Sequence, residues 1–174
     1  TFFLRQNNIS SGGSPPPPSA SSSSRANMSK NIDTVLAILK NEVDGDVSSA
    51  LGKMTGDYSM TWMYRSLGNL FPASNNKVSE LREIYLIKGR QYEIKNISEG
   101  EDVVMVELIE SYPNPQTQKL YRTPLVLVLE MQNGKIKTGR HYCDPRLSHE
   151  DIDPQLLEKV YSNSPTKLVI RASA

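Results

Sequence analysis

The dipeptide Asn133–Gly134 constrains the fold more than any other feature of this sequence. Both residues tolerate the positive φ that a type I′ turn requires, so the pair predicts a tight β-hairpin. The segment before it, residues 124–130, is almost wholly apolar, as a buried central strand is. The strand after it, residues 135–144, carries the chain's only cysteine, Cys143, and one of its two histidines, His141. The hairpin therefore joins a core strand to a strand that bears ionisable and reactive side chains.

The composition excludes several classes of protein. The 20 basic and 19 acidic residues give a formal charge of +1, which lacks the basic surplus of a nucleic-acid-binding protein. One cysteine and two histidines are too few for a structural zinc site, and a single cysteine forms no internal disulfide. No apolar run approaches the length of about 18 residues that a membrane span needs. We therefore expect a soluble, intracellular protein that holds no metal and binds neither nucleic acid nor a membrane.

Residues 1–27 differ in composition from the remainder. Their serine and proline runs hold too little apolar surface to offset the entropy of ordering, so this leader is predicted to be disordered. Its serine-rich, arginine-bearing and acid-free character is typical of an organellar transit peptide, which would place the protein in an organelle. A leader derived from a vector or from upstream translation, ahead of Met28, fits equally well. In both interpretations the folded domain begins at residue 28.

The spacing of apolar residues predicts helices first and strands later. The predicted helices cover residues 31–43, 46–54, 74–89 and about 153–162, and the predicted strands cover 58–65, 91–97, 102–112, 120–131 and 135–144. Asp46 and Asp153 are expected to be N-caps, the second with Pro154 at the first helical position. Residues 164–174 are predicted to be a flexible tail, although Leu168–Ile170 is apolar enough to dock. Helices followed by a strand meander indicate an α+β domain.

This order of elements resembles the nuclear transport factor 2-like superfamily. The phrase that carries the resemblance is Asn133-Gly134-Lys135-Ile136 leading to Arg140-His141-Tyr142-Cys143-Asp144-Pro145. It looks most like the SnoaL-like polyketide cyclase and limonene epoxide hydrolase branch. The resemblance covers residues 30–146 and implies that residues 28–163 form a cone-shaped, curved, mixed but mostly antiparallel sheet wrapped around the N-terminal helices, a cystatin-like α+β barrel. It also implies an apolar pocket for a small hydrophobic ligand and a homodimer formed through the sheet.

The resemblance also assigns side chains to the pocket. Because side chains alternate along a strand, Gly139, His141 and Cys143 are expected on the concave face. Arg140, Tyr142 and Asp144 are expected on the convex one. The residues expected to line the pocket are Tyr58, Met60, Trp62, Ile109 and Cys143. Simple core packing of Trp62 is an alternative. Cys143 has no base beside it in the sequence and is expected to be a small apolar residue rather than a nucleophile.

His141 is the best candidate for acid–base chemistry, because the ordinary pKa of histidine, about 6.5, lies near neutral pH. Epoxide hydrolases of this branch hold a catalytic aspartate at the matching position. The strand at 103–112 also lacks their arginine and aspartate and offers only Glu107 and Glu110. The resemblance therefore does not carry over the hydrolase triad.

Glu107 lies in an apolar run, where a carboxylate is costly unless it is exposed or paired. It either faces the pocket and orients His141, or lies on the outer sheet surface at a dimer interface. Tyr64 or Tyr58 would stabilise negative charge on a substrate oxygen. We expect a small-molecule pocket protein that acts as a cofactor-free isomerase, cyclase or dehydratase on a small hydrophobic substrate, with His141, Glu107 and Tyr64 as catalytic residues. The alternative is a non-catalytic module of the same fold that binds a ligand or a protein.

Overall fold

The computed structural model describes residues 22–65, 71–84, 86–148 and 152–172. Within these residues, one curved sheet has seven strands in the order β2-β1-β6-β5-β4-β3-β7. Strand β1 runs parallel to β6, and every other neighbouring pair is antiparallel. The strands are β1 (Met54–Trp62), β2 (Ser74–Lys77), β3 (Gln91–Glu99), β4 (Val103–Pro113), β5 (Leu120–Gln132), β6 (Lys135–Tyr142) and β7 (Leu168–Ile170). This mixed, mostly antiparallel sheet confirms the predicted fold class.

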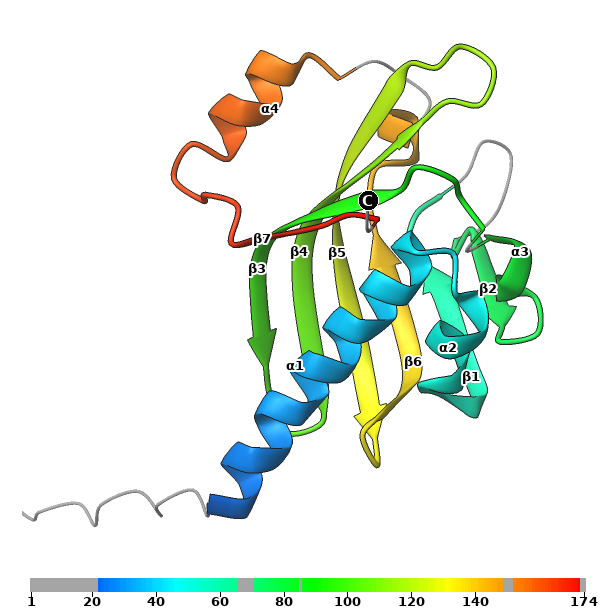
Figure 1. Cartoon of the computed structure of the whole chain (residues 1–174), viewed down its shortest axis with the longest axis vertical. Helices are drawn as coiled ribbons and strands as arrows, with labels where there is room; N and C mark the ends of the chain where they lie inside the picture. The colour runs from blue at the N-terminus through cyan, green and yellow to red at the C-terminus, as the bar shows by residue number, and fades with distance from the viewer. Residues whose placement is uncertain (1–21, 66–70, 85, 149–151, 173–174) are drawn as a thin grey trace, which may run out of the picture.

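Helix α1 (Ser22–Val43) crosses the concave face of the sheet, as Figure 1 shows. It packs on strands β3, β4, β6 and β7. Its apolar stripe is buried, with Val35, Ile38 and Leu39 at most 3% exposed. The helix begins well before the predicted start at residue 31, so residues 22–27 of the segment expected to be disordered are helical. The rest of that segment, residues 1–21, lies outside the described residues.

The other helices are short: α2 (Val47–Gly52), α3 (Leu81–Ile84), the 3₁₀ turn η1 (Pro145–Ser148) and α4 (Pro154–Val160). Asp46 caps α2 by accepting a hydrogen bond from the backbone N–H of Ser49, and Asp153 caps α4 by accepting one from Gln155. Both predicted N-caps are therefore confirmed. Within the described residues, none of the helices combines the length and the apolarity needed to cross a membrane.

The hairpin between β5 and β6 has the predicted turn. Asn133 and Gly134 have φ values of 52° and 73°, which is the left-handed conformation that both central residues of a type I′ turn adopt. The flanking residues Gln132 and Lys135 are paired across the strands. The turn sets the pairing at the start of β6, and a register shift between Glu130 and Met131 then changes which side chains of β6 face helix α1.

The predicted helix over residues 74–89 is wrong. Residues 74–77 form strand β2, which pairs with β1 from Ser59↔Lys77 to Trp62↔Ser74. Ser74, Asn75 and Lys77 are exposed, so a helix here would have had little apolar surface to bury. Only residues 81–84 are helical, and they bury Leu81 completely. Tyr85, which was expected on the buried face, lies outside the described residues.

The predicted flexible tail also contains regular structure. Residues 168–170 form the edge strand β7, which pairs with β3 through Tyr92↔Ile170 and Ile94↔Leu168. Ile170 is 6% exposed, and its burial explains why this short segment is ordered against the sheet. The apolar stretch that the sequence marked as able to dock is therefore the part that does so.

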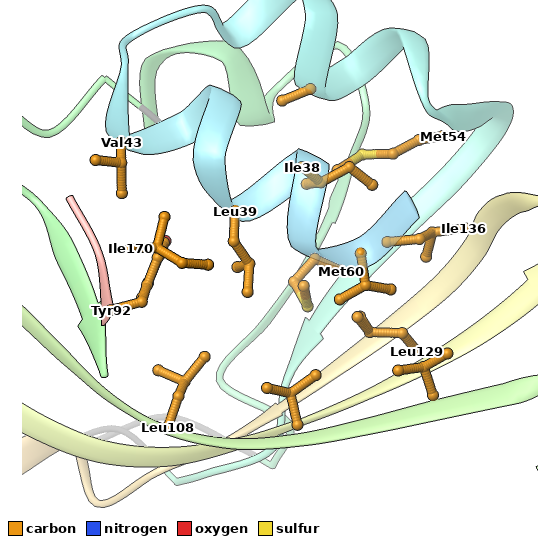
Figure 2. Close-up of a cluster of buried hydrophobic side chains, with 14 of the residues drawn as sticks. Ile38, Leu39, Val43, Met54, Met60, Tyr92, Leu108, Leu129, Ile136 and Ile170 are labelled. Carbon is orange, nitrogen blue, oxygen red and sulfur yellow. The ribbon is translucent and has the colours of Figure 1, made fainter. Parts of the chain in front are cut away.

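The hydrophobic core fills the space between α1 and the concave face. Figure 2 shows Ile38, Leu39 and Val43 of α1 pointing toward side chains from the sheet. The labelled partners from the sheet are Met54, Met60, Tyr92, Leu108, Leu129, Ile136 and Ile170. In β4 the even-numbered residues Val106 and Leu108 are fully buried in this core, so strand alternation directs the next even-numbered residue, Glu110, to the same side.

Candidate active site

A cavity of about 210 Å³ lies between α1 and the concave face of the sheet. Most of its wall is apolar, with Ile38 and Leu39 from the helix and Leu127 and Leu129 from β5. Its polar lining residues are Glu42, Tyr58, Trp62, Tyr64, Arg90, Tyr92, Glu110, Tyr112, His141 and Cys143. The volume is smaller than the roughly 300–1,000 Å³ of pockets for drug-sized ligands, so the cavity suits a small molecule.

Six residues singled out from the sequence lie on this wall. Strand β1 and the residues just after it contribute Tyr58, Met60, Trp62 and Tyr64. Strand β6 contributes His141, and Cys143 follows just after its end. Gly139 lies between these two groups. A Cβ atom at Gly139 would be 2.8 Å from Met60 Cε and 2.9 Å from the Tyr58 hydroxyl, so only glycine permits this close approach.

The structure places Glu107 and Ile109 elsewhere. Glu107 accepts a hydrogen bond of 2.6 Å from Asn96 Nδ2 and does not line the cavity. Ile109 is 1% exposed, yet it is also absent from the cavity wall. Strand alternation puts both on the outer face of β4, opposite Leu108 and Glu110. Of the two positions predicted for Glu107, it occupies the one on the outer sheet surface and not the one facing the pocket beside His141, and Glu110 is the carboxylate of this strand that reaches the cavity.

His141 packs edge-on against Trp62, with ring centroids 6.1 Å apart and an interplanar angle of 82°. Its Nδ1 atom is buried and has no hydrogen-bond partner among the described residues. Burial, and then the charge of Arg90, lower the pKa of His141 to about 4. The imidazole is therefore neutral at pH 7, and its pKa lies below the near-neutral value on which its predicted acid–base role was based.

A buried cluster of two carboxyl groups and one guanidinium lines the same cavity. Arg90 Nε lies 2.9 Å from Glu110 Oε1, and Arg90 Nη1 lies 3.8 Å from Glu42 Oε2. The Tyr92 hydroxyl donates a 2.7 Å hydrogen bond to Glu42 Oε2. The side chains of Arg90 and Glu42 are 5% and 7% exposed. Three separate elements supply the cluster: the last turn of α1, the start of β3 and the end of β4.

This cluster holds two carboxyl groups, of Glu42 and Glu110, and one guanidinium, of Arg90. Burial raises the pKa of Glu42 to about 7, while Arg90 and the Tyr92 hydrogen bond oppose the rise and Glu110 adds to it. Burial also raises the pKa of Glu110, against the effect of Arg90. Two carboxyl groups share one guanidinium, so the cluster takes up a proton near neutral pH. A carboxyl group with such a pKa can both donate and accept a proton at pH 7.

This cluster was not predicted from the sequence, although one of its residues gives a signal there. Glu42 follows Leu39 by three residues and Ile38 by four, so it falls on the apolar stripe of the helix. A carboxylate on a buried stripe is as informative as Glu107 in its apolar strand. Arg90 gives no comparable signal, because it precedes β3 and no periodic pattern includes it.

Cys143 and Tyr64 complete the wall. Burial, with smaller contributions from Glu110 and Asp144, raises the pKa of the Cys143 thiol to about 11, so it is protonated at neutral pH and unsuited to nucleophilic attack. Burial also raises the pKa of Tyr64, which keeps its phenol protonated as a hydrogen-bond donor. No group of three or more metal-ligating side chains occurs within the described ranges.

Comparisons with known proteins agree on the fold. No protein-family model matches the sequence. No curated protein matches it either. Among solved structures, a nuclear transport factor 2-like protein of unknown function from Cytophaga hutchinsonii has a TM-score of 0.55 at 14% identity, covering 69% of this chain and 95% of that one.

Two further structures are similar to the same degree. An LEH-like epoxide hydrolase from M. tuberculosis has a TM-score of 0.57 at 18% identity and covers 78% of this chain and 98% of its own. A putative isomerase from Bacillus subtilis has a TM-score of 0.58 at 14% identity, with coverages of 80% and 97%. At such low identity the likeness concerns the fold. The chain has the nuclear transport factor 2-like fold, which is the fold that the sequence resemblance predicted.

Proposed function

We propose that this protein binds a small apolar molecule in the cavity and catalyses a cofactor-free acid–base reaction on it, with Glu42 as the proton carrier. The observation that carries the proposal is a buried carboxyl group on the cavity wall whose pKa is raised to about 7. General acids and bases are most effective when their pKa lies near the working pH. The reaction classes that fit are isomerisation, cyclisation and dehydration.

In an isomerisation, ionised Glu42 removes a proton from a carbon atom beside a carbonyl group and returns it to another carbon atom. No electron acceptor is needed, because one proton leaves the substrate and one proton is added to it. Tyr64 donates a hydrogen bond to the substrate oxygen on which negative charge develops. Arg90 favours the ionised form of Glu42, while burial favours the protonated one, and this opposition holds the group ready for both steps.

A second candidate reaction is the opening of an epoxide, because two carboxyl groups and one guanidinium line a single cavity. Protonated Glu42 would donate its proton to the epoxide oxygen. Glu110, held beside Arg90, would accept a proton from the attacking water. One of the structures with this fold is an LEH-like epoxide hydrolase. Glu42 and Arg90 are therefore not members of the hydrolase triad, which the resemblance does not carry over to this sequence.

The non-catalytic alternative rests on the same cluster. Arg90 has carboxylates on two sides, and the Tyr92 hydroxyl already donates to Glu42, so the network also suits a purely structural role. In that case the cavity would bind a ligand without changing it. Removing the ionisable group at position 42 while keeping its shape separates the two functions.

The test is solvent deuterium exchange into cyclohexanone and cyclohex-2-enone, followed by proton NMR. The protein is expected to accelerate exchange beside the carbonyl group, with a rate that rises with pH through about 7. Glu42→Gln is expected to lower this rate by about 100-fold or more. Glu107→Gln is the matched control, because it changes a carboxylate on the outer face, and it should leave the rate unchanged. Equal rates for the wild type and Glu42→Gln would refute the catalytic proposal.

We also propose that the protein forms a homodimer through the outer face of its sheet. Strand pairing brings Met105 beside Val128 and Val126 beside Tyr142, and Met105 and Tyr142 are exposed. An ion pair between Arg140 and Glu130 borders this patch. A second copy related by two-fold symmetry can place each of these charges beside its opposite, which favours a self-complementary contact.

A further inference from the structure

His141 presents unused hydrogen-bonding capacity in the cavity. Its ring lines the wall beside Trp62, and its Nδ1 atom has no hydrogen-bond partner within the described residues. A ligand can form a hydrogen bond only with a ring nitrogen that it reaches, and an enclosed nitrogen is not available to it. Because Nδ1 itself is enclosed, the edge of the ring that the cavity presents is the one that carries Nε2. This edge is an acceptor or a donor for a ligand hydroxyl group.

The charges around the cavity disfavour an ionic ligand. Glu42 and Glu110 face the single guanidinium of Arg90, and one proton on a carboxyl group brings their sum to zero. The imidazole of His141 is neutral at pH 7. An anion would meet two carboxyl groups and a guanidinium that is already paired, while a cation would lie beside that guanidinium. Moving either ion out of water costs free energy, and the charged groups that the described residues place at the cavity are already paired with one another.

We propose that the ligand of this cavity is an uncharged molecule with a small apolar body and one hydroxyl group, which forms a hydrogen bond with the imidazole of His141. The apolar body lies against Ile38, Leu39 and the leucines of β5. This inference rests on the proposed small-molecule function and narrows its natural substrate class to molecules that carry a hydroxyl group. It also favours, among the proposed reactions, those that begin or end with an alcohol.

Binding can be measured with four probes that share one ring: benzyl alcohol, toluene, benzoate and benzylammonium. Trp62 is the only tryptophan in the chain and lies against His141, so its fluorescence reports what enters the cavity. Benzyl alcohol is expected to bind at least about tenfold more tightly than benzoate or benzylammonium. If either ion binds as tightly as the alcohol, the inference of an uncharged ligand is overturned.

The role of His141 is tested by comparing benzyl alcohol with toluene in the wild type and in His141→Leu. The comparison cancels the different solubilities of the probes in water. The ratio of the toluene dissociation constant to that of the alcohol is expected to fall about fivefold in His141→Leu, and to recover in part in His141→Asn, which keeps a polar group. Should His141→Leu not fold, as judged by circular dichroism, His141→Asn carries the comparison with a smaller expected fall. An unchanged ratio would overturn the proposal.

This outcome is separable from the proposed catalytic function. Deuterium exchange that depends on Glu42, together with an unchanged binding ratio, would leave the acid–base proposal standing and remove the alcohol inference. A changed ratio without exchange would support the alcohol site in a non-catalytic binding protein.

Discussion

The Tyr92 hydroxyl donates a 2.7 Å hydrogen bond to Glu42. This bond joins the second residue of β3 to the last turn of helix α1. A hydrogen bond to the carboxylate favours its ionised form, so Tyr92 lowers the pKa of Glu42 and partly offsets the larger effect of burial. Through this bond Tyr92 shifts the protonation equilibrium of Glu42 toward its ionised form.

Replacing Tyr92 by Phe is therefore expected to raise the pKa of Glu42 further above 7. The pH dependence of deuterium exchange should shift toward alkaline pH, and the protein should lose about 1 kcal/mol of stability. Tyr121→Phe is the control, because the Tyr121 hydroxyl accepts a hydrogen bond from Asn114 outside the cavity. A pH profile that is the same in Tyr92→Phe and the wild type would contradict this role.

Glu42 and His141 should affect stability in opposite directions as the pH changes. The folded pKa of Glu42, about 7, exceeds the ordinary 4.5, so the folded state binds more protons between these values and its stability falls as the pH rises. The folded pKa of His141, about 4, is below the ordinary 6.5, so its contribution rises with pH between 4 and 6.5. The two nearly cancel from pH 4.5 to 6.5.

Single variants should reveal each slope in urea unfolding at several pH values. Relative to the wild type, Glu42→Gln is expected to gain stability as the pH rises to 7, by up to about 1.4 kcal/mol per pH unit. His141→Asn is expected to lose stability relative to the wild type from pH 4 to 6.5. Parallel curves for all three proteins would show that neither group has a shifted pKa.

Gly139→Ala should damage the cavity from its wall. The added Cβ atom would lie 2.8–2.9 Å from the side chains of Met60 and Tyr58, which must move. Overpacking of this kind costs about 1–3 kcal/mol, and the displaced side chains should weaken the binding of benzyl alcohol. Gly56→Ala is the matched control in β1, since a Cβ atom there meets nothing within 4 Å. Equal melting temperatures and affinities for both variants would be inconsistent with this packing.

The dimer proposal predicts that Met105→Lys yields a monomer. Met105 is 47% exposed, so the change introduces charge on the outer face without disturbing the core. Leu156→Lys, at an exposed apolar site on α4, is expected to leave the dimer intact. Sedimentation velocity at micromolar concentration distinguishes the two masses. A wild-type protein that is already monomeric would refute the proposed interface.

Local chemistry made much of this fold predictable. Asn133–Gly134 specified its turn, Asp46 and Asp153 specified two helix starts, and the overall order of elements specified the fold class. The helix predicted for residues 74–89 was wrong because the pairing of residues 74–77 with β1 outweighed the weak helical pattern of this segment. The prediction of a flexible tail missed strand β7, because the order of this segment depends on its pairing with β3, which is distant in the sequence.

The candidate site also has a part that was predictable from the sequence and a part that was not. Residues on one strand face, such as His141 and Cys143, follow from alternation, and six of the residues singled out from the sequence lie on the cavity wall. Predicting which carboxylate of β4 faces the cavity needed the strand register. The structure shows that it is Glu110 rather than Glu107. Glu42 and Arg90 meet only in the folded chain, so no local pattern could place them together.

The most direct test of the central claim is the titration of the Glu42 carboxyl group. Carbon-13 NMR of protein labelled at the glutamate side-chain carbon can follow this group from pH 3 to 9, with Glu42→Gln identifying its resonance. We predict a midpoint near pH 7, shifted upward in Tyr92→Phe. A midpoint near the ordinary value of 4.5 would mean that Glu42 is fully ionised at neutral pH, and would contradict its role as the proton carrier.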